Sequence, residues 1–491
     1  MYRICLKLIV LSISVLVLSA GCAKDELAVL SSAKIPVTTA SSMALNEFQQ
    51  GMSFSNKQQR VKAVEHFHLA LAQDPEFAMA WLQLAFVSPG TDLFMAALDS
   101  ARKHAAHTSE GEQLIIKAAY KGFTANSIEQ EVILKKLVSQ FPGDEQAHLL
   151  LGNYYFGLQQ YHKAIESYTS AAKVNNDLAI LHNQLGYSQR ALGNYGEAEK
   201  AFKFYIKLNS DNPNAYDSYA ELLMEMGRFK ESIEFYAMAL ERDSYFVASY
   251  VGIACNYGFL GEPAKALEQL ELLKSIAQND NDTRRAIFTE ALTHVCSGKI
   301  EKALESMESS LEIDELRQDV GNIANDLLIL GNLYLELDSP AEALARFNQS
   351  MRIINASNLP EAVKDNAYTT HLYNISRVFS AKGEFGKAEE TAELFERKVN
   401  MSGNPLRIQL SSQLKGILAL EQNQFQKAID QLEQANQLNP YNLYRIGKAY
   451  QGLERHENAA TYLLRAEELN VLNSMDQAIV LSKTKFAKDP A

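Results

Sequence analysis

A pattern that recurs every 34 residues constrains the fold of this chain more than any other feature of its sequence. Three consecutive segments, 145–178, 179–212 and 213–246, each carry a small residue at their eighth position and another at their twentieth. Periods of roughly 20–50 residues are typical of solenoids, in which each unit packs mainly against its neighbours. A chain of 491 residues also exceeds the size of one ordinary core. We therefore expect an extended array of units.

Continuing the same register gives twelve predicted units. They begin at Ala44, Ala78, Gly111, Glu145, Ala179, Pro213, Val247, Arg284, Ala324, Thr369, Gln409 and Pro440. The eighth residue of every unit is Gly, Ala or Ser, and the twentieth is Ala in ten units, with Gln130 and Ser232 as the exceptions. Two helices pack closely only where one of them presents almost no side chain. The pattern therefore predicts a helix–turn–helix unit.

This period and these small positions resemble the tetratricopeptide repeat (TPR). The resemblance implies an all-α fold, a right-handed TPR-type helical solenoid of about 12 helix–turn–helix repeats. The starts from Arg284 to Gln409 are 40, 45 and 40 residues apart, so these units should have longer helices or longer loops. The expected parts are repeats 1–7 over 44–280, longer irregular repeats 8–10 over 281–408, repeats 11–12 over 409–470, and a C-terminal capping helix and tail over 471–491.

The N-terminus has the features of an export signal. A short basic region precedes an apolar run at 8–18 and the residues Ser19-Ala20-Gly21-Cys22, which is the order found in secretory signals. The alternative is a short transmembrane anchor. Residues 22–43 are rich in Ser, Thr and Ala and are expected to form a flexible tether.

The last four residues of this signal resemble the bacterial lipoprotein box, although Ser19 stands where that family prefers Leu. The resemblance implies a signal peptide over 1–21, lipidation of Cys22, and attachment to the membrane through more than one acyl chain. It also implies a location in the bacterial cell envelope, on the outer membrane, because Ala23 follows the cysteine.

The sequence offers no pattern for chemistry. It has no Gly-rich phosphate loop, nucleophile elbow or zinc signature, and the repeats leave no stretch for a catalytic domain. We therefore expect no enzymatic activity, no metal and no cofactor. The formal charge of −12 argues against a nucleic-acid partner. Cys255 and Cys296 should be small buried residues, with a disulfide between them as the alternative, and His148 and His182 should be core histidines.

The resemblance implies that the functional surface is the concave groove, lined by the first helix of each unit at positions two, five, nine and twelve. The partner-binding residues predicted there are Asn153, Asn183, Tyr187, Arg190, Asp217 and Glu221. Such amide, aromatic and charged groups bind peptide backbones and side chains, but the same residues could also be no more than solvated polar groups. The expected function is a membrane-anchored scaffold or adaptor that binds proteins or peptides, in envelope assembly or export. The alternative is an accessory substrate platform of an enzyme or carbohydrate-handling system.

Overall fold

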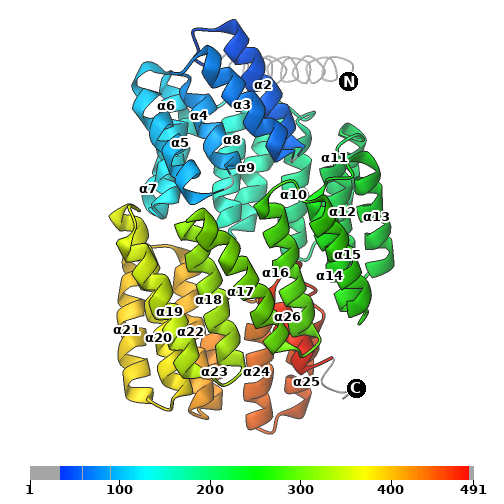
Figure 1. Cartoon of the computed structure of the whole chain (residues 1–491), viewed down its shortest axis with the longest axis vertical. Helices are drawn as coiled ribbons and strands as arrows, with labels where there is room; N and C mark the ends of the chain where they lie inside the picture. The colour runs from blue at the N-terminus through cyan, green and yellow to red at the C-terminus, as the bar shows by residue number, and fades with distance from the viewer. Residues whose placement is uncertain (1–33, 58, 89, 486–491) are drawn as a thin grey trace, which may run out of the picture.

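The computed structural model describes residues 34–57, 59–88 and 90–485. Within these ranges the regular elements are 25 α-helices and the short 3₁₀ helix η1 (Ala105–His107), with no strand. Twelve successive helical pairs are followed by one final helix (Figure 1). The prediction of an all-α solenoid of about 12 helix–turn–helix units is confirmed.

The first seven units have helices of ordinary TPR length. Their pairs are α2 (Ser42–Asn56) and α3 (Arg60–Gln73), α4 (Ala78–Val87) and α5 (Thr91–His104), α6 (Glu110–Phe123) and α7 (Ser127–Gln140), α8 (Glu145–Gly157) and α9 (Tyr161–Val174), α10 (Ala179–Ala191) and α11 (Tyr195–Leu208), α12 (Pro213–Glu225) and α13 (Phe229–Arg242), and α14 (Val247–Phe259) and α15 (Pro263–Ile276).

The later units differ mainly in helix length. Their pairs are α16 (Asp280–Cys296) and α17 (Ile300–Arg317), α18 (Val320–Glu336) and α19 (Pro340–Ala356), α20 (Glu361–Ala381) and α21 (Phe385–Ser402), α22 (Pro405–Glu421) and α23 (Phe425–Leu432), and α24 (Pro440–Gly452) and α25 (His456–Glu467), followed by α26 (Met475–Lys483). Helix α20 has 21 residues, whereas α8 has 13. The loop from α19 to α20 covers only 357–360. The extra length of units 8–10 therefore lies in their helices.

The small eighth residue of each unit is explained by a large side chain on the second helix. A Cβ atom added to Gly152 would lie 2.3 Å from the ring of Tyr168, and one added to Gly331 would lie 2.3 Å from the ring of Phe347. Both rings are fully buried. In these units a larger residue at the eighth position would have to displace a buried aromatic ring, which is costly in a close-packed core.

The turn between the two helices of a unit needs a left-handed residue. Gly193 and Gly227 have φ angles of 74° and 73°, and Gln159 and Glu454 occupy the same place in their units with φ of 57°. Glycine adopts this conformation without steric cost, whereas other residues pay about 1–2 kcal/mol. The turn geometry is thus common to the repeat, although the residue type is not.

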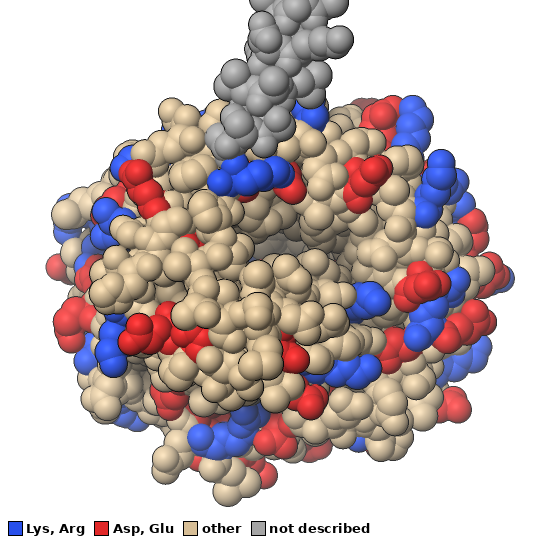
Figure 2. Space-filling view, turned by 90° about the horizontal axis from the view of Figure 1, so that it is seen from above, with Lys and Arg blue, Asp and Glu red and all other residues tan. Residues whose placement is uncertain are grey.

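The solenoid curls until its first three units meet its later ones. Gln59 Nε2, after α2, donates to Asp243 Oδ2 at 3.0 Å, and a Cβ added to Gly321 of α18 would lie 2.1 Å from Thr91 of α5. Figure 1 shows α2–α9 stacked above α18–α25. Seen from above, acidic and basic side chains mingle around a central hollow (Figure 2).

Residues 34–41 run along three successive junctions between units. Their backbone N–H groups donate from Ile35 to Asp144 (2.9 Å), from Thr38 to Glu112 (2.9 Å) and from Ala40 to Asp74 (3.0 Å). The described part of the predicted tether is therefore bonded to the body. The predicted signal peptide and Cys22 lie outside the described residues. No helix within the described ranges is both long and apolar enough to cross a membrane.

Candidate functional site

Three of the predicted groove residues come together on the inner face of units 5 and 6. Arg190 of α10 forms ion pairs with Glu221 at 3.0 Å and Glu225 at 3.1 Å, both on α12. Its guanidinium lies 4.7 Å from the ring centre of Tyr187, whose hydroxyl donates to Ser218 Oγ at 3.1 Å. The cluster thus joins two adjacent units, and its polar groups are largely engaged with one another.

Asp217 and Asn183 are buried instead of lining an open surface. Asp217 is 3% exposed and accepts a hydrogen bond of 2.8 Å from Ser249 Oγ on α14. Burial raises the pKa of Asp217 to about 8, and the charge of Glu221 acts in the same direction. Asn183 is 6% exposed, and its Oδ1 has no hydrogen-bond partner among the described residues. In this conformation neither side chain is exposed enough to contact a protein partner.

Asn153 is exposed on α8, in unit 4. Its Oδ1 accepts a hydrogen bond of 2.9 Å from the hydroxyl of Tyr168, in the second helix of the same unit. Among the described residues, no hydrogen bond links Asn153 to the Arg190 cluster. The six predicted residues therefore form a bonded cluster of three, a buried pair and one exposed amide.

The histidines expected in the core serve the turns between units. His148 Nε2 lies 3.0 Å from the carbonyl oxygen of Pro142, and His182 Nε2 lies 2.8 Å from that of Asn176. Each bond spans six residues, so the fourth residue of a unit closes the turn that precedes it. No group of three or more His, Cys, Asp or Glu side chains in the described part of the chain is arranged to hold a metal.

A second inner surface lies in units 9–12, where the first helices surround a cavity of about 430 Å³ that we call the chamber. Several lining residues stand at positions two, five and nine of their units, where the resemblance places the groove. They are Asn325, Leu328, Asn332, Tyr373, Arg377, Gln413 and Tyr441. The chamber falls within the range of about 300–1,000 Å³ that is typical of small-molecule sites.

One side of the chamber is bridged, because α24 and α26 contact α18, the helix at the start of unit 9. The hydroxyl of Tyr441 on α24 lies 2.9 Å from Glu336 Oε1 on α18. Lys483 of α26 forms an ion pair of 2.7 Å with the same carboxylate, and Ile479 of α26 lines the wall. Side chains of α18, α20, α22, α24 and α26 therefore surround the chamber, and we call this arrangement the ring.

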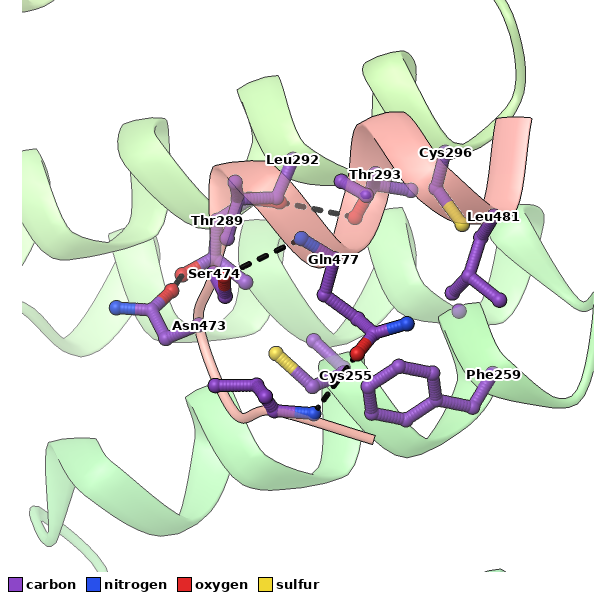
Figure 3. Close-up of a pocket in the computed structure, with 14 residues that line it drawn as sticks. Cys255, Phe259, Thr289, Leu292, Thr293, Cys296, Asn473, Ser474, Gln477 and Leu481 are labelled. Atoms are coloured by element: carbon purple, nitrogen blue, oxygen red, sulfur yellow. Dashed lines mark hydrogen bonds between the residues drawn. The ribbon is translucent and has the colours of Figure 1, made fainter. Parts of the chain in front are cut away.

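Helix α26 is also seated on the inner side of α14 and α16. Figure 3 shows Gln477 and Leu481 of α26 facing Cys255 and Phe259 around a space of about 40 Å³. Cys255 and Cys296 are free cysteines, as expected. Burial raises the pKa of Cys255 to about 11 and that of Cys296 to about 12, so both are neutral thiols at pH 7.

Three half-buried guanidiniums, those of Arg377, Arg407 and Arg445, line the chamber. Arg377 donates to the amide oxygen of Asn332 at 2.6 Å, and Arg445 lies 3.7 Å from the ring centre of Tyr441. Within the part of the chain that the structure describes, none of the three forms an ion pair. The chamber therefore presents positive charge, although the whole chain is acidic.

Sequence reasoning placed no site in the chamber. The usable signal was the groove positions themselves, which give Tyr373 and Arg377 in unit 10 and Gln413 in unit 11. Closure of the ring depends on α26 and on Glu336, a contact between residues more than a hundred positions apart that no local pattern indicates.

Comparison with known families supports the repeat assignment. A family model described as the tetratricopeptide repeat matches residues 145–178, 179–212 and 441–470. The chain contains tetratricopeptide repeats. A second model, described as the second ARM domain of tetratricopeptide repeat protein 21, matches residues 197–318. The first two TPR matches coincide with units 4 and 5.

Individual relatives are distant. Protein CTR9 homolog of Arabidopsis thaliana is 23% identical over 318 residues, which cover 64% of this chain and 28% of that protein. The chain therefore matches little more than a quarter of the length of that protein. A TPR protein from Parabacteroides merdae has a TM-score of 0.35 at 15% identity, covering 55% of this chain and 93% of that one. A structure of MamA has a TM-score of 0.28 at 20% identity, covering 37% and 95%.

Proposed function

We propose that this TPR chain is a scaffold or adaptor that binds a protein or peptide partner on the inner face of units 4–6. The observation that carries the proposal is the Arg190 cluster. Tyr187 and Tyr195 lie half-buried beside Arg190, and Tyr195 donates to Glu225 at 3.4 Å. Tyrosine and arginine are among the side chains most enriched where partners bind tightly, and tyrosine buries a large area at low entropic cost.

The ordered structure of the Arg190 cluster also supports a role in partner binding. Ion pairs between α10 and α12 hold the cluster in place before a partner arrives. A surface that is already ordered loses little conformational freedom on binding, so more of the interaction energy appears as affinity. Exposed Asn153, one unit away on α8, would extend the contact along the array.

We also propose that the scaffold is held at a membrane of the bacterial envelope by acyl chains on Cys22, with proteins rather than nucleic acids as partners. The support is the sequence Ser19-Ala20-Gly21-Cys22 and the formal charge of −12. The bonds of residues 34–41 to the junctions between units would fix where the chain leaves the solenoid toward such an anchor.

The partner site is tested by photocrosslinking in native envelopes. A crosslinking residue at exposed position 153 should capture a partner, and the variant Asn153→Arg should weaken its binding without loss of helix content. Exposed Glu241 provides the matched control: a crosslinker there, or Glu241→Arg, should have no such effect. Equal capture from both positions would disprove the proposed location.

The anchor is tested by Cys22→Ala. This variant should accumulate as an uncleaved precursor that incorporates no labelled fatty acid, because only a thiol accepts the lipid. Normal processing and membrane retention of the variant would exclude a lipid anchor at this residue.

A further inference from the structure

The charges of the chamber are not balanced from within. Of its two acidic lining residues, Glu336 is occupied by Tyr441 and Lys483, and Asp476 accepts a hydrogen bond of 2.6 Å from Asn439. The guanidiniums of Arg377, Arg407 and Arg445 line the cavity and form no ion pair among the described residues, although the charge of Asp365 acts on Arg407. A half-buried charge without a counter-ion is costly, and a bound anion would remove that cost.

The other side chains that line the chamber indicate which kind of anion would bind there. A guanidinium presents a planar fork of N–H donors that matches a carboxylate, often with two parallel bonds. The amide of Asn374, which is 4% exposed, adds a polar group to the lining, and Leu328, Ile329 and Phe395 supply apolar walls. The amide of Gln413 already bonds to Tyr373 and Asn442. Such a mixture suits an organic acid better than a bare inorganic ion.

Closure of the ring limits the size of the ligand. An open groove accepts a chain from the side, but the contacts of Glu336 with Tyr441 and Lys483 close that side here. The space among these side chains is about 430 Å³, which limits the part of a ligand that the chamber can hold. This geometry favours a compact molecule over an extended peptide.

We propose that the chamber is a binding site for a small organic polyacid, a compact molecule with two or more carboxylate groups held by Arg377, Arg407 and Arg445. The site goes beyond the proposed partner surface and uses different units of the array. Because the ligand binds only the closed ring, it should also stabilise units 9–12 against unfolding.

Citrate serves as the probe, with inorganic phosphate and a hexaglutamate peptide as comparisons, in calorimetric titrations of the full chain. We expect citrate to bind and to raise the unfolding temperature. Arg377→Met and Arg445→Met should each weaken citrate binding by about tenfold or more, the value of a lost charged hydrogen-bonding pair. Arg352→Met and Arg397→Met, which alter exposed arginines outside the chamber, should leave binding unchanged.

The conservative variant Arg445→Lys separates charge from shape, since lysine keeps the charge and loses the fork. It should bind citrate more weakly than the wild type and more tightly than Arg445→Met. All variants should keep the wild-type circular dichroism spectrum, because none leaves an acid without its partner. Absence of citrate binding, equal binding by the Met variants, or chamber-dependent binding of phosphate or hexaglutamate alone would each overturn the proposal.

Discussion

The inner faces of units 5–6 and of units 9–12 carry the same kinds of side chain with opposite outcomes. In units 5–6, Arg190 lies between two carboxylates of the next unit. In units 9–12, Arg407 and Arg445 face a cavity with no ion pair among the described residues. Units of 34 residues place equivalent positions side by side, so neighbours pair. In the later units the first helices and α26 surround a space, and the same positions line it. Repeat geometry thus decides whether a charge forms ion pairs with the next unit or lines a cavity without one.

The largest expected effect is on the free energy of unfolding, when one arginine in each region is replaced by methionine. Arg190→Met should lower the free energy of unfolding by about 2–3 kcal/mol, because it leaves Glu221 and Glu225 partly buried without their counter-ion. Arg407→Met should change it by less than about 1 kcal/mol or raise it, because it removes an unpaired cation. Urea unfolding followed by circular dichroism measures both. Equal losses of unfolding free energy in the two variants would contradict the proposed difference between units 5–6 and units 9–12.

Reversing the charge of both Asp217 and Glu221 would be a poor test of partner binding in the groove, because both side chains also make contacts within the fold. Asp217 is buried against Ser249 and Glu221 pairs with Arg190, so the double change would destabilise units 5 and 6 directly. Exposed Asn153 is the better position for separating fold from binding.

The contact between the two helices of a unit should also tolerate a larger side chain differently in the two regions. Ala198→Leu in unit 5 should cost about 1–3 kcal/mol, because the neighbouring Phe202 ring is fully buried and cannot turn aside. Ala428→Leu in unit 11 should cost less, because the side chain opposite Gly416 is the flexible Leu432. Thermal unfolding compares the two variants, and an unchanged midpoint for Ala198→Leu would show that the repeat register is wrong.

Buried Asp217 should make units 5–7 sensitive to pH. Its pKa rises from 3.8 in the unfolded chain to about 8 in the fold, so the folded form holds its proton more tightly. Stability should therefore fall as pH rises from about 4 to 8, and Asp217→Asn should abolish this contribution, so that the variant is more stable than the wild type at pH 8. Asp314, with a pKa raised to about 7, adds a slope of the same sign. An unaltered pH profile in Asp217→Asn would show that Asp217 is not the group responsible.

The smallest expected change in stability comes from substitutions in the left-handed turn between the two helices of a unit. Gly193→Ala should cost about 1 kcal/mol, and Glu454→Gly, at the same place in unit 12, should gain up to about that amount. Gly196→Ala, three residues away in α11 with open space around it, should stabilise the chain instead, because alanine is the better helix former. Chemical unfolding midpoints of the three variants give the comparison, and a loss for Gly196→Ala would contradict it.

Local residue patterns were sufficient to predict the elements. Gly152 and Gly186 at the eighth position marked the helix contacts that Tyr168 and Phe202 fill. The candidate sites were harder to predict. The groove positions correctly bring Tyr187, Arg190 and Glu221 together, but the same rule cannot tell that Asp217 is buried under Ser249. That burial depends on how tightly neighbouring first helices pack.

The sequence by itself determined the repeat, its twelve units and the inner face of each first helix, because these follow from side-chain sizes at fixed spacing within one or two units. Only the tertiary structure decided that α26 closes units 9–12 into a chamber, since its contact with Glu336 joins distant parts of the chain. Small rotations between successive units add up along a solenoid, and their sum sets the curvature. Curvature, in turn, places Arg377, Arg407 and Arg445 around a cavity.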